Sequence, residues 1–338
     1  MTRTTPPRPW DVASVFPALA GMARTATRLH PSPGDPTVHE SSVGGPLLWP
    51  ADEAWPVCAD DHHPHRLTTL EDVRTLRRIL TQAWQRPRPP RTNLLTPDEQ
   101  AVVDRIHAGH DPSLLPAEPL PLIALAQLYA RDVPDLPCPD GTDMLQVLWC
   151  PFSEIEDSPS AVHLRWRQSG SVRDVLAHPP APDFVGLDDY VPAPCVLHPE
   201  RVVEYPAAHE LDPALTDRIC AWEKEQQQSE GQGLSYRGDL SVAPGWKVGG
   251  WSAPWTFCGP MEVRCDCGAP VAPLLTVDSS EWDGESSGWR PVEDRDEAGR
   301  PPYPDWDCPT MVTVGRGYTL QVYRCTDSYG HPPVTTLQ

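Results

Sequence analysis

The chain has 338 residues and a formal net charge of −20, which argues against a nucleic-acid partner because affinity for phosphate depends on clustered lysine and arginine. No stretch of the sequence approaches the run of about 18 apolar residues that a membrane span needs, so we expect no membrane association. The apolar fraction of 39%, together with 44 prolines and 13 tryptophans, indicates a folded protein with many turns and large aromatic anchors.

Residues 1–40 are predicted to form an N-terminal helix followed by a linker. The apolar stretch at residues 12–23 is similar to the core of a signal peptide, but Pro17 interrupts it. Its apolar residues recur at helical spacing, which favours an amphipathic helix capped by Ser14. We therefore expect a cytoplasmic protein whose ten cysteines are thiols or metal ligands and not disulfides.

The chain contains an internal repeat. Val43–Gly45 returns as Val248–Gly250, and Leu145–Cys150 returns as Leu320–Cys325, in the same order. Because neither half looks able to bury its own hydrophobic face, the repeat predicts one two-lobed body. The predicted fold class is α+β and mostly antiparallel β, internally duplicated, with two β lobes related by a pseudo-twofold and with peripheral helices.

Glycine pairs and glutamines inside the repeats have expected structural roles. Paired glycines that bound strands usually form tight turns, so we assign Gly44-Gly45 and Gly249-Gly250 to turns. Gln127, Gln146 and Gln321 lie within apolar strands, where a buried amide needs hydrogen-bond partners. We expect the side chain of each glutamine to form hydrogen bonds that join neighbouring loops.

The first β repeat is predicted at residues 41–152, with a helical insertion at residues 60–118. One helix of the insertion begins near Thr69. Another begins at residues 96–99, where Thr-Pro-Asp-Glu supplies an N-cap, a proline at the first helical position and an acid at the third.

Residues 153–243 are predicted to bridge the two repeats and to contain a helix at residues 212–230, which begins at an Asp-Pro pair. The second β repeat follows at residues 244–338. Its acidic loop, residues 278–307, lacks the spacing of a calcium-binding loop, so we expect a solvated loop or hairpin there.

The cysteines of the second repeat predict a structural zinc site. Cys265 and Cys267 are one residue apart, so both thiolates can face one metal ion from a tight turn. Cys325 is the leading third ligand because it ends the last predicted strand of the repeat. The competing interpretation is a set of reduced, buried thiols. The candidates for the fourth ligand are Cys258, which completes the predicted set, and its competitors Cys308 and His331.

The first repeat offers a related set of residues at corresponding places. Cys58, His62 and Cys150 would form a second metal site if Cys58 and Cys150 approached each other. In the alternative, the histidine-rich segment at residues 62–65 is only an exposed loop.

Several motifs in the first repeat, taken in order, resemble the YwqG-like family of bacterial proteins. They are Ser42–Pro46, Leu125–Leu128, Val133–Pro137 and Leu145–Val147. The segment Lys247–Gly250 is similar to the second Gly-Gly element of that family. The resemblance covers residues 41–58, 119–152 and 244–326.

The resemblance implies a duplicated, mostly β, α+β fold without an established enzymatic activity. It also implies distant kinship with programmed-cell-death-2-type proteins, which act as ribosomal-protein chaperones and carry cysteine knuckles comparable to residues 265–267. Some members of the family are encoded near toxin and immunity genes, which implies a partner-binding role. This chain departs from the family at residues 315–317, where Gly-Arg-Gly stands in place of an acidic Gly-Asp-type turn.

The sequence contains no Walker loop, dinucleotide fingerprint or His-Glu-x-x-His helix. We therefore expect a monomeric, non-enzymatic protein, chaperone-like or immunity-like, that holds a protein client or toxin-like partner between its lobes. The expected contacts are exposed aromatic residues near the turns: Trp49, Trp55, Trp251 and Trp255.

The alternative is a zinc-dependent hydrolase or nucleic-acid-processing enzyme. It would use a zinc ion at Cys265, Cys267 and Cys325 with an open coordination position for water. Four protein ligands that close the metal site would count against this alternative.

Overall fold

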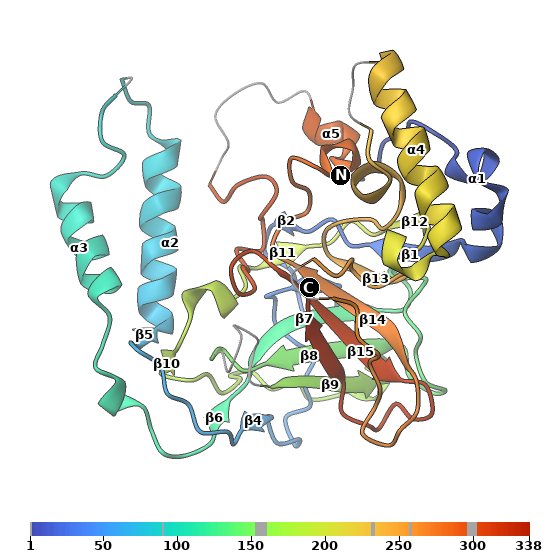
Figure 1. Cartoon of the computed structure of the whole chain (residues 1–338). Helices are drawn as coiled ribbons and strands as arrows, with labels where there is room; N and C mark the ends of the chain where they lie inside the picture. The colour runs from blue at the N-terminus through green and yellow to red at the C-terminus, as the bar shows by residue number, and fades with distance from the viewer. Residues whose placement is uncertain (1, 90, 153–160, 231–233, 257–258, 296–302) are drawn as a thin grey trace.

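The computed structural model describes residues 2–89, 91–152, 161–230, 234–256, 259–295 and 303–338. Its strands pair antiparallel, and helices lie around them (Figure 1), so the predicted α+β, mostly antiparallel class is confirmed. Two six-stranded sheets form the centre of the fold. None of the helices in the described ranges has the length and apolar character that crossing a membrane requires.

The first sheet has the strand order β2-β11-β3-β7-β8-β9. Its strands are β2 (Ser32–Pro33), β3 (Ser42–Val43), β7 (Ile123–Tyr129), β8 (Met144–Trp149), β9 (Val162–Arg167) and β11 (Cys195–Val196). The four strands from β3 to β9 follow one another along the sheet in chain order. β11 and β2 extend the sheet beyond β3, and β7 carries a register irregularity between Ala124 and Ala126.

The second sheet has the strand order β12-β1-β13-β14-β15-β16. Its strands are β1 (Arg24–Arg28), β12 (Glu200–Glu204), β13 (Lys247–Gly249), β14 (Val271–Asp278), β15 (Thr319–Cys325) and β16 (Val334–Leu337). The strands from β13 to β16 again follow chain order. β1 and β12 extend the sheet beyond β13, and β14 carries a register irregularity between Pro273 and Leu275.

The chain crosses between the sheets twice. It leaves the second sheet after β1 and enters the first at β2, and it leaves the first sheet after β11 and enters the second at β12. Residues that the sequence assigns to the N-terminal linker and to the bridge therefore supply strands to both sheets.

One hydrophobic cluster joins the two sheets. Leu125 and Val147 of the first sheet belong to the same buried cluster as Leu275 and Val322 of the second, and all four side chains are fully buried. Because the sheets bury their apolar faces in one shared core, neither sheet has a complete core of its own.

The glutamines in the central strands form buried hydrogen bonds, as predicted. Gln127 Oε1 accepts hydrogen bonds from the Leu48 amide at 2.7 Å and from Gln146 Nε2 at 2.9 Å. In the second sheet, Gln321 Oε1 accepts a hydrogen bond from the Ala253 amide at 3.1 Å. Each amide thus satisfies the backbone of a loop that follows a glycine pair.

Gly250 occupies a position that no side chain fits, which agrees with its assignment to a turn. Its φ is +70°, a conformation that favours glycine. A Cβ atom built there would lie 2.2 Å from Glu204 Oε2. The Glu204 carboxylate fills this space because it binds the amide of Trp251 and the side chain of Lys247.

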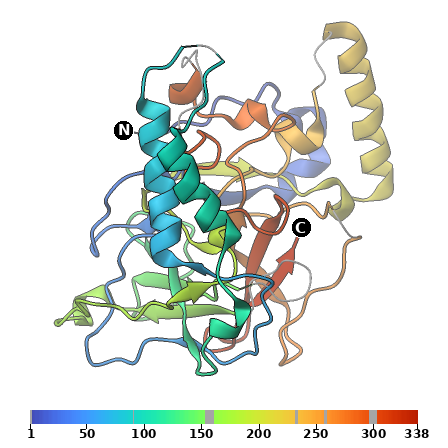
Figure 2. The same ribbon diagram turned by 90° about the vertical axis from the view of Figure 1, so that its left-hand side faces the viewer.

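Two helices of the predicted insertion lie side by side at one end of the molecule, as Figures 1 and 2 show. They are α2 (Leu70–Gln85) and α3 (Pro97–Ala108). Thr69 caps α2 by accepting a hydrogen bond from the Asp72 amide, and the predicted capping box of α3 is present. Two small sheets lie below them, one of β5 (Thr68–Thr69) with β10 (Phe184–Val185) and one of β4 (Val57–Cys58) with β6 (Leu120–Pro121).

On the opposite side of the molecule lie α1 (Val12–Val15) and α4 (Pro213–Glu230), as Figure 1 shows. The α4 prediction is confirmed. The predicted Ser14 cap is wrong, because Asp11 caps α1 and Ser14 is already inside the helix. Pro17 cannot donate a backbone hydrogen bond, so α1 ends early and a 3₁₀ turn, η1 (Pro17–Met22), replaces the longer helix.

The remaining helical elements of the described residues are short. They are η2 (Pro112–Leu114), η4 (Ser169–Ser171), η5 (Asp188–Tyr190), η6 (Ala208–Glu210), the π-turn η7 (Tyr236–Leu240), η8 (Ser287–Trp289) and α5 (Val292–Arg295).

Candidate metal centre

Cys265 and Cys267 lie in a tight turn that leads directly into β14. The Cys265 amide donates to Ala269 O at 3.0 Å, and the Gly268 amide donates to Cys265 O at 2.8 Å. Gly268 has a φ of +86°, which a residue with a side chain rarely adopts. The turn therefore depends on the glycine that follows the Cys-x-Cys motif.

The pairing of β14 with β15 brings this turn to Cys325. Val271, the first residue of β14, is the register partner of Cys325, the last residue of β15. The chain then turns back toward β16, and His331 lies in this connection. The Cys-x-Cys turn thus meets the distant end of β15, and the connection that follows β15, at one end of the second sheet.

The four donor atoms lie at distances that suit one tetrahedral ion. Cys265 Sγ and Cys325 Sγ lie 3.6 Å and 3.4 Å from His331 Nδ1, and Cys267 Sγ lies 3.6 Å from Cys325 Sγ. All four atoms lie within 4.8 Å of one another. With zinc–sulfur and zinc–nitrogen bonds of about 2.3 and 2.0 Å, a tetrahedron has S···S edges of about 3.8 Å and S···N edges of about 3.5 Å. The three separations given above agree with these edges to within about 0.2 Å.

The Cys325 thiol is set up to ionise near neutral pH. Burial acts to raise its pKa, but hydrogen bonds from His331 and from the amides of Asp327 and Ser328 outweigh burial and lower the pKa to about 6. Metal binding requires the thiolate. The lowered pKa therefore favours the form of this side chain that binds metal.

A disulfide does not explain the proximity of these cysteines. Cys267 Sγ and Cys325 Sγ are 3.6 Å apart, whereas a disulfide bond is about 2.05 Å long. Cys265, Cys267 and Cys325 are all free thiols.

The fourth side chain of this potential metal-binding group, in the described part of the chain, is His331. Cys308 lies elsewhere, with its Sγ directed at Val312 O, so it does not join the group. Cys258 falls outside the described residues. The useful signal in the sequence is the short spacing of six residues between Cys325 and His331, which lets one turn return the imidazole to the end of the strand.

The tryptophans expected to contact a partner have different environments. Trp49 is fully buried and its Nε1 donates to Glu53 O, so it packs the core and does not face a partner. Trp55 is half-buried, with its ring centre 5.0 Å from that of Trp49. Trp251 is half-buried beneath the Arg24 guanidinium, 3.5 Å from its ring centre, and Trp255 is half-buried.

A buried ion pair beside the second glycine pair has no simple signal in the sequence. Lys247 Nζ lies 2.6 Å from Glu204 Oε1, and both side chains are fully buried. Lys247 is on β13 and Glu204 is on β12, so the pair spans β1, which lies between these strands.

Comparison with known proteins adds no assignment, because no family model matches the chain and no curated protein is significantly similar to it.

Proposed function

We propose that the protein is a zinc-stabilised, non-enzymatic binding protein with a duplicated YwqG-like fold. The observation that carries the proposal is the convergence of Cys265, Cys267, Cys325 and His331. A set of three cysteines and one histidine is typical of structural zinc sites, in which four protein ligands fill the tetrahedron. The ion would tie the β14 turn, the end of β15 and the β15–β16 connection together.

The closed ligand set disfavours a hydrolase at this centre. A catalytic zinc ion keeps one coordination position for water or substrate. Here His331 takes the position that an open site would leave to water. The zinc-dependent enzyme considered from the sequence is therefore not our proposal for this group of residues.

The pairing pattern of the strands supports the duplication. β3, β7, β8 and β9 correspond in order to β13, β14, β15 and β16, and the register irregularity occurs in the second strand of each set. β11 and β2 next to β3 correspond to β1 and β12 next to β13. We infer two copies of one unit that exchange their first strands, β1 and β11, so that each copy completes the other's sheet.

The partner that we propose is a basic protein, for which the chain would act as a chaperone-like or immunity-like binder in the cytoplasm. The support is the net charge of −20, which attracts basic surfaces and speeds their encounter at low salt. The protein itself would be a monomer.

Zinc content tests the metal centre. We expect Cys325→Ser to lose one zinc ion per chain relative to the wild type, as measured by elemental analysis of protein purified without chelators. Cys220→Ser is the matched control, because Cys220 is an exposed thiol outside the group. Equal zinc content in wild type and Cys325→Ser would refute the structural zinc.

Partner capture tests the binding role. We expect immobilised protein to retain a basic protein in stoichiometric amount from native extract, and the complex to weaken as ionic strength rises. Failure to recover any stoichiometric protein at low or at physiological salt would refute the proposed binding function.

A further inference from the structure

A second group of metal-binding side chains lies in the first half of the chain. Cys58 belongs to β4, Cys150 follows the last residue of β8, and His62 lies in the segment between β4 and β5. β4 is held by β6, since Cys58 is the register partner of Leu120. Cys150 is fixed by its amide, which donates to Ala161 O at 2.9 Å.

The His62 ring is held in place by an aromatic neighbour. It stacks on Phe152 with ring centres 4.6 Å apart and an interplanar angle of 14°. Its Nε2 lies 3.5 Å from Cys150 Sγ, which equals the S···N edge of about 3.5 Å in a tetrahedral zinc site. The donor atoms of Cys58, His62 and Cys150 all lie within 4.8 Å of one another.

This group has three members in the part of the chain that the structure describes, whereas the group around Cys325 has four. The carboxylate of Asp60 adjoins this group, because its Oδ2 accepts a hydrogen bond from Cys58 Sγ at 3.4 Å. Asp60 does not belong to the mutually close set. Two cysteines and one histidine with a fourth position left for an exogenous ligand are known from catalytic zinc sites.

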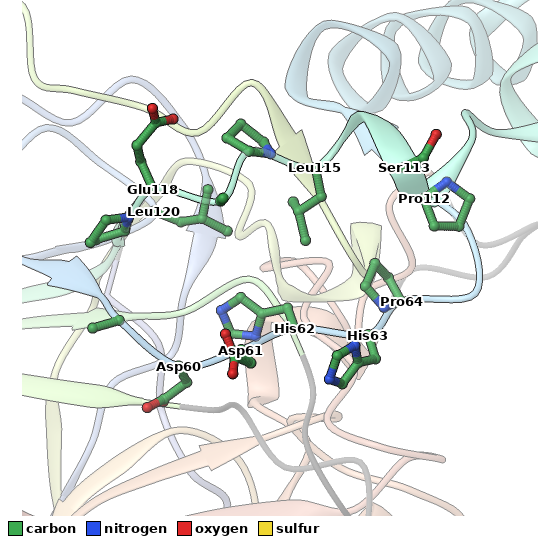
Figure 3. A pocket seen from close by; sticks show the side chains of 14 residues that line it. Asp60, Asp61, His62, His63, Pro64, Pro112, Ser113, Leu115, Glu118 and Leu120 are labelled. Atoms are coloured by element: carbon green, nitrogen blue, oxygen red, sulfur yellow. The ribbon is translucent and has the colours of Figure 1, made fainter.

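A cavity of about 520 Å³ adjoins the group, and His62 is part of its wall. Figure 3 shows the segment of residues 60–64 on one side of this cavity and the segment of residues 112–120 on the other, with the His62 ring between them. Cys58 and Cys150 are buried, and neither lines the cavity. A metal ion held by His62 and these cysteines would therefore lie at the inner surface of the cavity.

We propose that Cys58, His62 and Cys150 bind a second zinc ion, and that its fourth coordination position is filled from the cavity by water or a small neutral donor ligand. The acids on the wall, Asp61 and Glu118 among them, disfavour an anionic ligand and favour water, an amine or an imidazole-like nitrogen. This site differs from the one around Cys325 because its metal ion can exchange one ligand.

Zinc stoichiometry tests the existence of the second site. We expect two zinc ions per wild-type chain and one in Cys58→Ser, with circular dichroism to confirm that the variant is folded. A single zinc in the wild type that Cys325→Ser removes and Cys58→Ser retains would overturn this proposal and leave the closed site intact.

Cobalt substitution tests the exchangeable position. We expect imidazole to change the visible absorption of the cobalt-loaded wild type and of Cys325→Ser, which keeps only the second site. Cobalt-loaded Cys58→Ser, which keeps only the closed site, is the control and should not respond. A wild-type spectrum that imidazole leaves unchanged would overturn the open position.

Asp60→Asn decides whether the neighbouring carboxylate is a ligand, and it does so without removing a cysteine. We expect this variant to keep two zinc ions and its response to imidazole. Loss of one zinc ion would make Asp60 the fourth ligand and overturn the exchangeable position.

Discussion

Replacing Lys247 with methionine removes one charge from a fully buried ion pair. In the wild type, Lys247 Nζ donates to Glu204 Oε1 at 2.6 Å and to Trp251 O at 2.8 Å. Methionine is similar in length but has no ammonium group, so the Glu204 carboxylate would remain buried and lose its charged partner. Removing one partner of a buried pair costs about 3–5 kcal/mol of unfolding free energy. At about 2 °C per kcal/mol for a chain of this size, the midpoint of thermal unfolding falls by roughly 6–10 °C.

The measurement is urea unfolding at pH 7, followed by tryptophan fluorescence. The sequence contains one other lysine, Lys224, which is exposed on α4. Lys224→Met is therefore a matched control, and we expect it to change stability by less than about 0.5 kcal/mol. A loss below about 1 kcal/mol in Lys247→Met, close to that of the control, would refute the reasoning.

A double variant identifies the origin of the loss. In Glu204→Gln with Lys247→Met, the uncompensated charge is gone, so we expect recovery of at least about 2 kcal/mol relative to Lys247→Met alone. No recovery would mean that lost packing and hydrogen bonds, and not the buried charge, account for the instability.

Three further changes have expected outcomes. Gly250→Ala should destabilise the protein by more than about 2 kcal/mol in urea unfolding, because a Cβ would lie 2.2 Å from a buried carboxylate at a φ of +70°. Its control is Gly284→Ala, which has open space around it and should change stability by less than about 1 kcal/mol. Equal effects of the two variants would contradict the explanation. A chelator should lower the thermal midpoint of the wild type by several degrees more than that of Cys325→Ser, because the bound ion stabilises the folded state; identical shifts would contradict a structural role for the ion. Burial raises the pKa of Glu281 to about 7 from its usual 4.5, so the folded state favours the protonated acid. The contribution of this preference to the free energy of unfolding is fully present below pH 4.5 and is lost as the pH rises to about 7. Relative to Glu281→Gln, the wild type should lose about 3 kcal/mol across this interval in urea titrations, and a pH-independent difference would contradict the raised pKa.

The local part of the structure was predictable because its causes are local. Thr69 and the Thr96–Glu99 segment cap helices through hydrogen bonds to amides within the same turn, and these contacts are readable from the spacing of a few residues. The wrong prediction that Ser14 caps the first helix also has a local cause, because Asp11 is the residue that caps this helix.

The pairing of the short strands was not predictable from such patterns. β2 and β11 have two residues each, too few for an alternation of apolar and polar side chains to be recognised. Their place in the first sheet follows from the return of the chain from distant positions, which the sequence assigns to a linker and a bridge. Long-range pairing of this kind depends on which sheet edges are left for the chain to extend.

The two groups of potential metal ligands also combine local features, which the sequence shows, with long-range features, which it does not. From the sequence alone, Cys265, Cys267 and Cys325 form the second repeat's candidate site, because a Cys-x-Cys turn and a strand-ending cysteine are local features. Only the tertiary structure selects His331 over Cys308, since the connection after β15 brings the imidazole within 3.4 Å of Cys325 Sγ.

The sequence by itself determined the class of fold, the helix starts at Thr69 and Thr96, and the residue types able to bind zinc. The tertiary structure decided how the first strands pair across the two sheets, that Trp49 is buried, and which side chains meet at each metal-binding group. The physical reason is the sequence separation of the interacting residues. Caps, turns and side-chain chemistry depend on neighbours along the chain, whereas burial and coordination depend on residues that folding brings together from far apart.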